Sequence, residues 1–306
     1  MKNVSYLYLT LSQCAIASNV VLGKFLIEEV PLFFYLGLRF FFSSIFLFII
    51  FKLSKETLKN KKHKESKIHK REWKYLLLQA LSAGLLFNTL FYWGIDYTTA
   101  TSAGIISASL PGFIALLAYF ILGEHLGIRK ITALLIAMLG IALLNIDNTA
   151  NIATPIHGSF LGDALILLSI IPEALYSIFT KKLRGKISPL GGAMLVNVFS
   201  FLMFFPLLLI TIIQAKDFTV QTQHIGLLML GGVCSVFFFW FWSKGLEGVL
   251  ASTAALFGGI APIVITVLAV LFLGEVFTIV DLGGMILVLC SLVLGSRNKL
   301  RTNEIS

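Results

Sequence analysis

Long runs of apolar residues, separated by short polar or charged breaks, occupy almost the whole chain. The runs cover residues 6–26, 32–51, 75–95, 100–122, 131–146, 160–180, 190–213, 225–243, 252–273 and 279–295. Most of them approach the roughly 20 apolar residues that a helix needs to cross a bilayer. The pattern therefore predicts an all-α integral membrane protein with ten transmembrane helices.

The composition excludes several other classes of protein. Hydrophobic residues make up 58% of the 306 residues and charged residues only 13%, whereas soluble domains contain about 45–50% apolar and about 25% charged residues. So few charges cannot cover the surface of a soluble enzyme or a secreted domain of this length. A net charge of +9 is also typical of nucleic-acid binders, but here its placement along the chain has a better explanation.

The basic residues give the expected orientation. If the N-terminus is cytoplasmic, 21 of the 24 lysines and arginines fall on the cytoplasmic side, ten of them between Lys52 and Lys74. Only Lys24 and Lys216 fall on the opposite side, and Arg39 lies within a span. Cytoplasmic loops carry such an excess, so we expect both termini inside, in the cytoplasmic membrane. The 52–74 loop either contacts anionic lipid or is simply solvated, and we favour the second.

The second half of the chain repeats the first. With a shift of 151 residues, the stretch 100–144 aligns without a gap with 251–295. Pro111 then meets Pro262, and Leu122, Gly123 and Glu124 meet Leu273, Gly274 and Glu275. A duplicated unit with an odd number of spans places its two copies in opposite orientations. Two inverted five-helix repeats are typical of secondary transporters.

These residues resemble a known family, the ten-helix EamA-type transporters of the drug/metabolite transporter superfamily. The resemblance rests on Tyr97, Thr98, Ala103, Pro111, the triplet ending at Glu124, and Gly140, echoed by Ala251, Ala254, Pro262 and the triplet ending at Glu275. It implies a first repeat over 1–147, a second, inverted repeat over 159–296 and a cytoplasmic tail over 297–306. It also implies transport of a small molecule and no cofactor. The Pro172–Glu173 pair departs from the family pattern.

Glu173 is the most informative single residue, because it is a carboxylate near the middle of a span. Such a group costs at least about 2.5 kcal/mol on insertion scales and normally faces a partner or water. We expect it to bind a substrate amine or a coupling proton, the alternative being a paired structural carboxylate. Tyr176 follows three residues later and can share its face.

Arg39 and the two aligned prolines are candidates for gating or structure. Arg39 either contacts a substrate carboxylate, pairs with Glu173, or snorkels outward, and we favour a structural or gating role. Pro111 and Pro262 remove a backbone donor in mid-span and therefore predict hinges or packed kinks. Glu124 and Glu275 end their spans and either close gates or terminate helices, of which we favour the second.

Further candidates for the substrate cavity are amides and aromatic residues within spans. Asn19 and Asn88 fall well inside the first and third spans, although interhelical hydrogen bonding is the default for such amides. Tyr92, Tyr176 and Trp240 have the chemistry of an aromatic cage for a cation. The five histidines fall outside the spans, and no metal-ligand spacing or ATP-binding motif is present.

The leading hypothesis is a secondary carrier that moves amino acids or related metabolites, by alternating access and in the direction of efflux. The alternative is an importer or exchanger of an amine-bearing or nucleoside-like metabolite. A membrane-embedded lipid-handling enzyme or a channel fits less well, because neither a clustered catalytic set nor a ring-forming pattern is evident. We expect protons as a possible coupling ion, contact with membrane lipids, a monomer or dimer, and no nucleic-acid partner.

Overall fold

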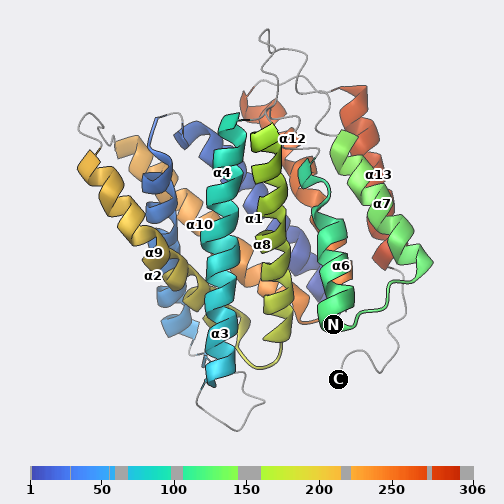
Figure 1. The fold of residues 1–306 in the computed structure, drawn as a ribbon, viewed down its shortest axis with the longest axis horizontal. Coiled ribbons are helices and arrows are strands. Elements are labelled where there is room, and N and C mark those ends of the chain that lie inside the picture. The colour runs from blue at the N-terminus through green and yellow to red at the C-terminus, as the bar shows by residue number, and fades with distance from the viewer. Residues whose placement is uncertain are drawn as a thin grey trace. The chain divides into compact units, whose positions relative to one another are not determined.

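The structure is a computed structural model that describes residues 2–27, 29–54, 56–58, 68–97, 106–143, 160–214, 222–273 and 278–296. These residues are helical apart from turns and short connections (Figure 1). The helices of the first repeat are α1 (Lys2–Ile27), α2 (Leu32–Ser54), α3 (Lys70–Gln79), the π-helix η1 (Ala80–Leu86), α4 (Phe87–Tyr97), α6 (Leu110–Leu122) and α7 (Ile128–Leu143). Those of the second are α8 (Phe160–Lys182), α9 (Pro189–Gln214), α10 (Thr222–Leu246), α11 (Ala251–Phe257), α12 (Ile260–Leu273) and α13 (Ile279–Ser296).

The ten predicted spans correspond to these helices, and the protein is an all-helical membrane protein with two repeats. Seven helices in the described part of the chain are individually long and apolar enough to cross a bilayer. Three consecutive segments, α3, η1 and α4, together form the third span, which begins at Lys70, inside the basic stretch. Helix α3 begins there because the Glu72 carboxylate accepts a hydrogen bond from the backbone N–H of His69 (2.8 Å), which stabilises a helix start.

Both aligned prolines mark a break in their span. Helix α6 begins at Leu110, so Pro111 occupies its first turn, directly after a turn at Ala108 and Ser109. Helix α11 ends at Phe257, and α12 resumes with Pro262 as its third residue. In the first turn of a helix the missing proline N–H has no intrahelical partner to lose. Each proline therefore starts a new helical segment instead of kinking a continuous helix.

The chain folds into two compact units, and each unit takes helices from both repeats. Unit 1 contains residues 1–85 and 179–248, and unit 2 contains residues 86–178 and 249–306. In unit 1, α1 packs against α10, and α2 packs against α9 and α10. In unit 2, α7 packs against α13, and α6 packs against α11. The compact units thus cut across the sequence halves.

Equivalent spans of the two repeats pack against each other in opposite directions. Gly37 on α2 lies against Leu208 on α9, whereas Ser43, further along α2, meets Asn197, earlier on α9. In unit 2, Ala133 and Gly140 on α7 lie against Gly295 and Gly284 on α13, again in reverse order. Such antiparallel packing of repeat mates is the arrangement that an inverted duplication requires.

Glycines allow the close approach in unit 2. A Cβ at Gly140 would lie 2.9 Å from the Gly284 carbonyl oxygen and 2.9 Å from a Val288 methyl group. Small residues at such crossings permit the backbone contact that drives helix association in lipid. Ala108, Ile141 and Val288 form the buried cluster beside this crossing.

Candidate functional site

Glu173 lies on α8 in unit 2, on the side of the helix that faces away from the exposed apolar surface. The exposed residues Leu167, Leu168 and Ile171 lie within about one third of the helix circumference. Glu173 falls nearly opposite them and is partly buried. No described residue forms a hydrogen bond or an ion pair with its carboxylate.

Polar side chains form a stripe along the same face of α8. Ser169, Glu173, Tyr176 and Thr180 follow a spacing of four, three and four residues, which keeps them on one side of a helix. Tyr176 is only 1% exposed, so its ring is a packed wall element of this stripe and not an open aromatic surface. The stripe begins at mid-span and ends near the C-terminus of α8.

Asn19, predicted as a cavity residue, joins three helices of unit 1. Its amide donates to the hydroxyl of Ser235 on α10 (2.8 Å), and its side-chain oxygen accepts from the hydroxyl of Tyr35 on α2 (3.0 Å). All three side chains are buried. Both ends of the amide therefore hold helices together.

Arg39 is buried beside this cluster. Its guanidinium lies over the rings of Phe40 (4.7 Å) and Tyr35 (5.5 Å), and the whole residue is 6% exposed. The stem of Arg39 lies next to Gly231 on α10, where a Cβ would be 3.9 Å from the Arg39 Cγ, an ordinary van der Waals contact. The aromatic faces stabilise the buried cation. Arg39 and Glu173 belong to different units.

The other cavity candidates are divided between the units. Asn88 and Tyr92 lie one turn apart on α4 in unit 2, Asn88 buried and Tyr92 half-buried against Phe91. Trp240 lies on α10 in unit 1, and the ammonium group of Lys244 is 5.8 Å from its ring centroid. A cation of the protein itself therefore already lies near this indole.

Glu124 caps a helix of the other repeat. Its carboxylate accepts hydrogen bonds from the backbone N–H groups of Ala251 (2.7 Å) and Ser252 (3.0 Å), and from the Ser252 hydroxyl (2.5 Å). The preceding Gly123 adopts a φ of +69°, which ends α6 in a left-handed turn and favours glycine. Glu275, the repeat mate of Glu124, lies outside the described residues.

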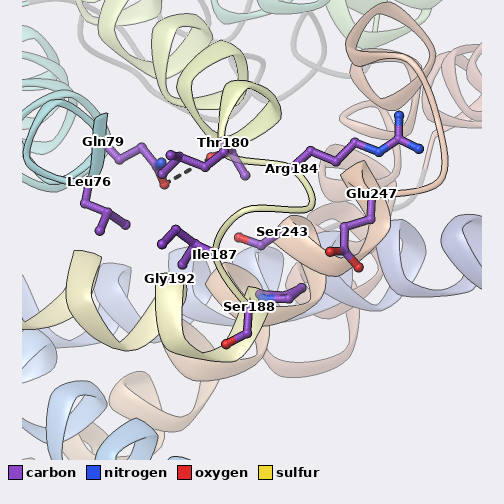
Figure 2. Close-up of a pocket in the computed structure, with 11 residues that line it drawn as sticks. Leu76, Gln79, Thr180, Arg184, Ile187, Ser188, Gly192, Ser243 and Glu247 are labelled. Carbon is purple, nitrogen blue, oxygen red and sulfur yellow. Dashed lines mark hydrogen bonds between the residues drawn. The ribbon is translucent and has the colours of Figure 1, made fainter. Parts of the chain in front are cut away.

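An open recess in unit 1 was not predicted from the sequence. Figure 2 shows its lining, which comes from α3, the end of α8, the start of α9 and the end of α10. Its polar members are Gln79, Thr180, Arg184, Ser188, Ser243 and Glu247. These residues are spread over four segments of the chain, so only the fold brings them together.

Sequence reasoning also missed a contact of His224, which was expected in a loop. The structure places it in the first turn of α10, buried, with its Nε2 atom 2.5 Å from a Glu29 carboxylate oxygen. No cluster of three potential metal ligands occurs among the residues that the structure describes.

The comparison with known protein families decides the identity of this fold. The sequence matches the EamA-like transporter family twice, over residues 3–146 and 160–297. The chain belongs to the EamA-like transporter family. It is therefore a multi-pass membrane transporter of a small-molecule substrate and not an enzyme.

Known relatives and one solved structure resemble this EamA-family chain. The chain is 28% identical to the uncharacterized transporter YetK of Bacillus subtilis, over 92% of this chain and 83% of YetK. It is 29% identical to a thiamine-repressible mitochondrial transport protein of Saccharomyces cerevisiae, over 50% of this chain and 43% of that protein. A solved crystal structure superposes with a TM-score of 0.78 at 14% identity, covering 97% of both chains, and shows the same fold.

Proposed function

We propose that this EamA-family protein is a secondary carrier that exports a small amine-bearing metabolite, an amino acid or a related compound, across the cytoplasmic membrane by alternating access. The observation that supports the proposal is the Glu173 carboxylate, which lies in mid-span on the protein-facing side of α8 and has no hydrogen-bond or ion-pair partner among the residues that the structure describes.

A carboxylate at this depth costs at least about 2.5 kcal/mol on insertion scales, so it is retained where it meets water, a cation or a proton. Its electrostatic complement among metabolites is an ammonium group. The same group takes up a proton when no ammonium is bound, which would couple export of the substrate to entry of a proton. Glu173 is thus our candidate for the shared site of substrate amine and coupling proton.

The packing of the repeats supports alternating access. Each compact unit pairs spans of one repeat with antiparallel spans of the other. Inverted repeats of this kind let a carrier adopt two conformations that open to opposite sides. We therefore propose that the units are the bodies that move, with the breaks before Pro111 and Pro262 as points where helices bend.

The experiment is counterflow in proteoliposomes preloaded with unlabelled amino acids. We expect saturable exchange of a labelled amine-bearing amino acid and its loss in Glu173→Gln. Asp163→Asn, a neutralised carboxylate in the first turn of the same helix, is the matched control and should retain exchange. Linear, non-saturable flux would indicate a channel. Normal exchange by Glu173→Gln with an unchanged pH profile would refute the role of Glu173.

Membrane vesicles of both orientations test the direction of transport. Export driven by an inward proton gradient predicts faster uptake into inside-out vesicles than into right-side-out vesicles. Faster uptake into right-side-out vesicles would establish an importer instead.

A further inference from the structure

Two cations from different helices converge on one tyrosine ring in unit 1. The Arg71 guanidinium carbon lies 5.9 Å from the centroid of the Tyr75 ring, and the Lys182 ammonium nitrogen lies 5.6 Å from it. Arg71 belongs to the first turn of α3, whereas Lys182 is the last residue of α8. The Tyr75 ring also contacts Phe179 on α8, with 5.9 Å between the ring centroids. Tyr75 therefore gathers two positive charges where α3 meets the end of α8.

No acidic side chain neutralises this pair of cations in the part of the chain that the structure describes. No ion pair there joins Arg71 or Lys182 to a carboxylate, and both interact with the neutral hydroxyl of Tyr75. Glu72, next to Arg71 in the sequence, is buried and accepts a hydrogen bond from the backbone N–H of His69. The aromatic ring stabilises each cation, but the two like charges repel each other. An anion bound between them relieves this repulsion.

The charge around the pair is also positive. Lys70 and Lys74 are exposed on α3, and Lys186 is exposed four residues after Lys182. These residues belong to the side of the membrane that the basic residues predict to be cytoplasmic. The cytoplasmic leaflet carries anionic lipids, and basic groups near its surface attract them. The location therefore favours an anionic lipid as the occupant.

Apolar side chains continue from the cationic pair along both helices. Leu78 follows Tyr75 by three residues on α3, and Phe179 precedes Lys182 by three residues on α8, so each lies on the same side of its helix. Both are half-buried. The exposed residue Ile171 lies eleven residues, or about three turns, before Lys182, so this side of α8 faces the surroundings and not the protein interior. A soluble anion would use only the charges, whereas a phospholipid would also cover this apolar surface.

We infer that Arg71 and Lys182, held together by Tyr75, bind the phosphate of an anionic phospholipid. The guanidinium offers paired N–H donors to two phosphate oxygens, and the ammonium group supplies the second positive charge. An acyl chain of the lipid then lies along Leu78 and Phe179. The sequence alone favours a solvated stretch over residues 52–74, and the contact of Arg71 with Tyr75 beside the end of α8 changes that interpretation for the end of this stretch. The inference does not depend on which substrate is transported.

Native mass spectrometry of the full-length protein in detergent tests the preference for an anionic lipid. The probes are phosphatidylglycerol and phosphatidylcholine with identical acyl chains. We expect the first phosphatidylglycerol to bind at least fivefold more tightly than the first phosphatidylcholine. Equal affinities would overturn the inference, because phosphatidylcholine carries a phosphate but no net charge.

Glycerol 3-phosphate distinguishes a lipid site from a site for a soluble anion, since it offers the phosphate without acyl chains. A hundredfold excess over phosphatidylglycerol should leave lipid binding unchanged. Displacement of the lipid under these conditions would show that the two cations hold a soluble phosphate and would overturn the assignment to a lipid.

Charge-matched variants separate this site from the general attraction between basic residues and anionic lipid. The double variant Arg71→Gln/Lys182→Gln should weaken binding of the first phosphatidylglycerol at least fivefold. The control Lys70→Gln/Lys186→Gln removes the same number of charges from exposed positions nearby in the sequence and should stay within twofold of the unchanged protein. Equal losses in the two double variants would overturn a specific site, as would unchanged affinity in Arg71→Gln/Lys182→Gln.

The ring of Tyr75 is tested by a conservative and a disruptive substitution. Tyr75→Phe keeps the aromatic face that gathers the cations and should retain affinity for phosphatidylglycerol within twofold. Tyr75→Leu removes this face and should weaken binding at least threefold. Melting temperatures in detergent without added lipid confirm that each variant is folded. Unchanged affinity in a folded Tyr75→Leu protein would refute the role of the ring in forming the site.

Discussion

Glu124, at the end of α6 in the first repeat, binds Ser252, at the start of α11 in the second, through both the backbone N–H and the hydroxyl of the serine. The carboxylate is 5% exposed and also accepts the N–H of Ala251. It therefore satisfies two of the N–H groups that lack intrahelical partners at a helix start. Its negative charge also lies at the positive end of the helix dipole.

This cap predicts a large loss of stability in Glu124→Ala. The substitution leaves two buried N–H groups without a partner, and each costs about 1–3 kcal/mol. We expect the melting temperature in detergent, followed by tryptophan fluorescence, to fall by several degrees. Glu124→Gln retains an acceptor oxygen and should lose less than half as much. Equal losses in the two variants would mean that the charge, and not hydrogen bonding, stabilises this junction.

The crossing of α7 and α13 gives a test of packing. A Cβ at Gly140 would approach the Gly284 carbonyl oxygen and Val288 to 2.9 Å. Overpacking typically destabilises by about 1–3 kcal/mol, so Gly140→Ala should lower the melting temperature. Gly283→Ala is the control on α13, because a Cβ there meets nothing within 4 Å. A smaller effect at Gly140 than at Gly283 would contradict the close approach.

Variants of Asn19 and of its partner Ser235 test whether the Asn19 amide is structural or binds the substrate. Interhelical hydrogen bonds in membranes contribute about 0.6 kcal/mol on average, so Asn19→Ala should lower stability modestly. Ser235→Ala removes the acceptor of the same bond and should have a similar effect. If both variants keep the KM for counterflow, the amide is structural. A raised KM in Asn19→Ala alone would support a role of the Asn19 side chain in binding the substrate.

Much of this architecture could be predicted from the sequence because bilayer thickness dictates it. Apolar run lengths located the spans, and the aligned Pro111 and Pro262 located the two breaks. The partners of polar residues could not be predicted in the same way. Glu124 and Ser252 are 128 residues apart in the sequence, and Glu29 and His224 are 195 residues apart. Such pairs depend on which helices become neighbours, and apolar runs carry no record of that.

The division into compact units could not be predicted from the sequence either, because it also depends on which helices become neighbours. A repeat in sequence suggests two structural halves, but α2 contacts its antiparallel mate α9 far more extensively than it contacts α1 of its own repeat. The recess at Gln79 and Arg184 exists only after this exchange of helices, since its lining combines α3 with the ends of α8 and α10.

The break before Pro262 allows a test of whether this span bends during transport. Pro262 has no backbone N–H to donate to the carbonyl four residues earlier, in the turn between α11 and α12. Pro262→Ala restores this donor and so allows the two segments to form one straighter helix. We expect normal expression and a raised melting temperature, with the maximal rate of counterflow reduced at least threefold, because a continuous helix resists bending. Pro206→Ala, inside α9, is the matched control for removing a proline from a span. A normal rate in Pro262→Ala would show that the break serves packing alone.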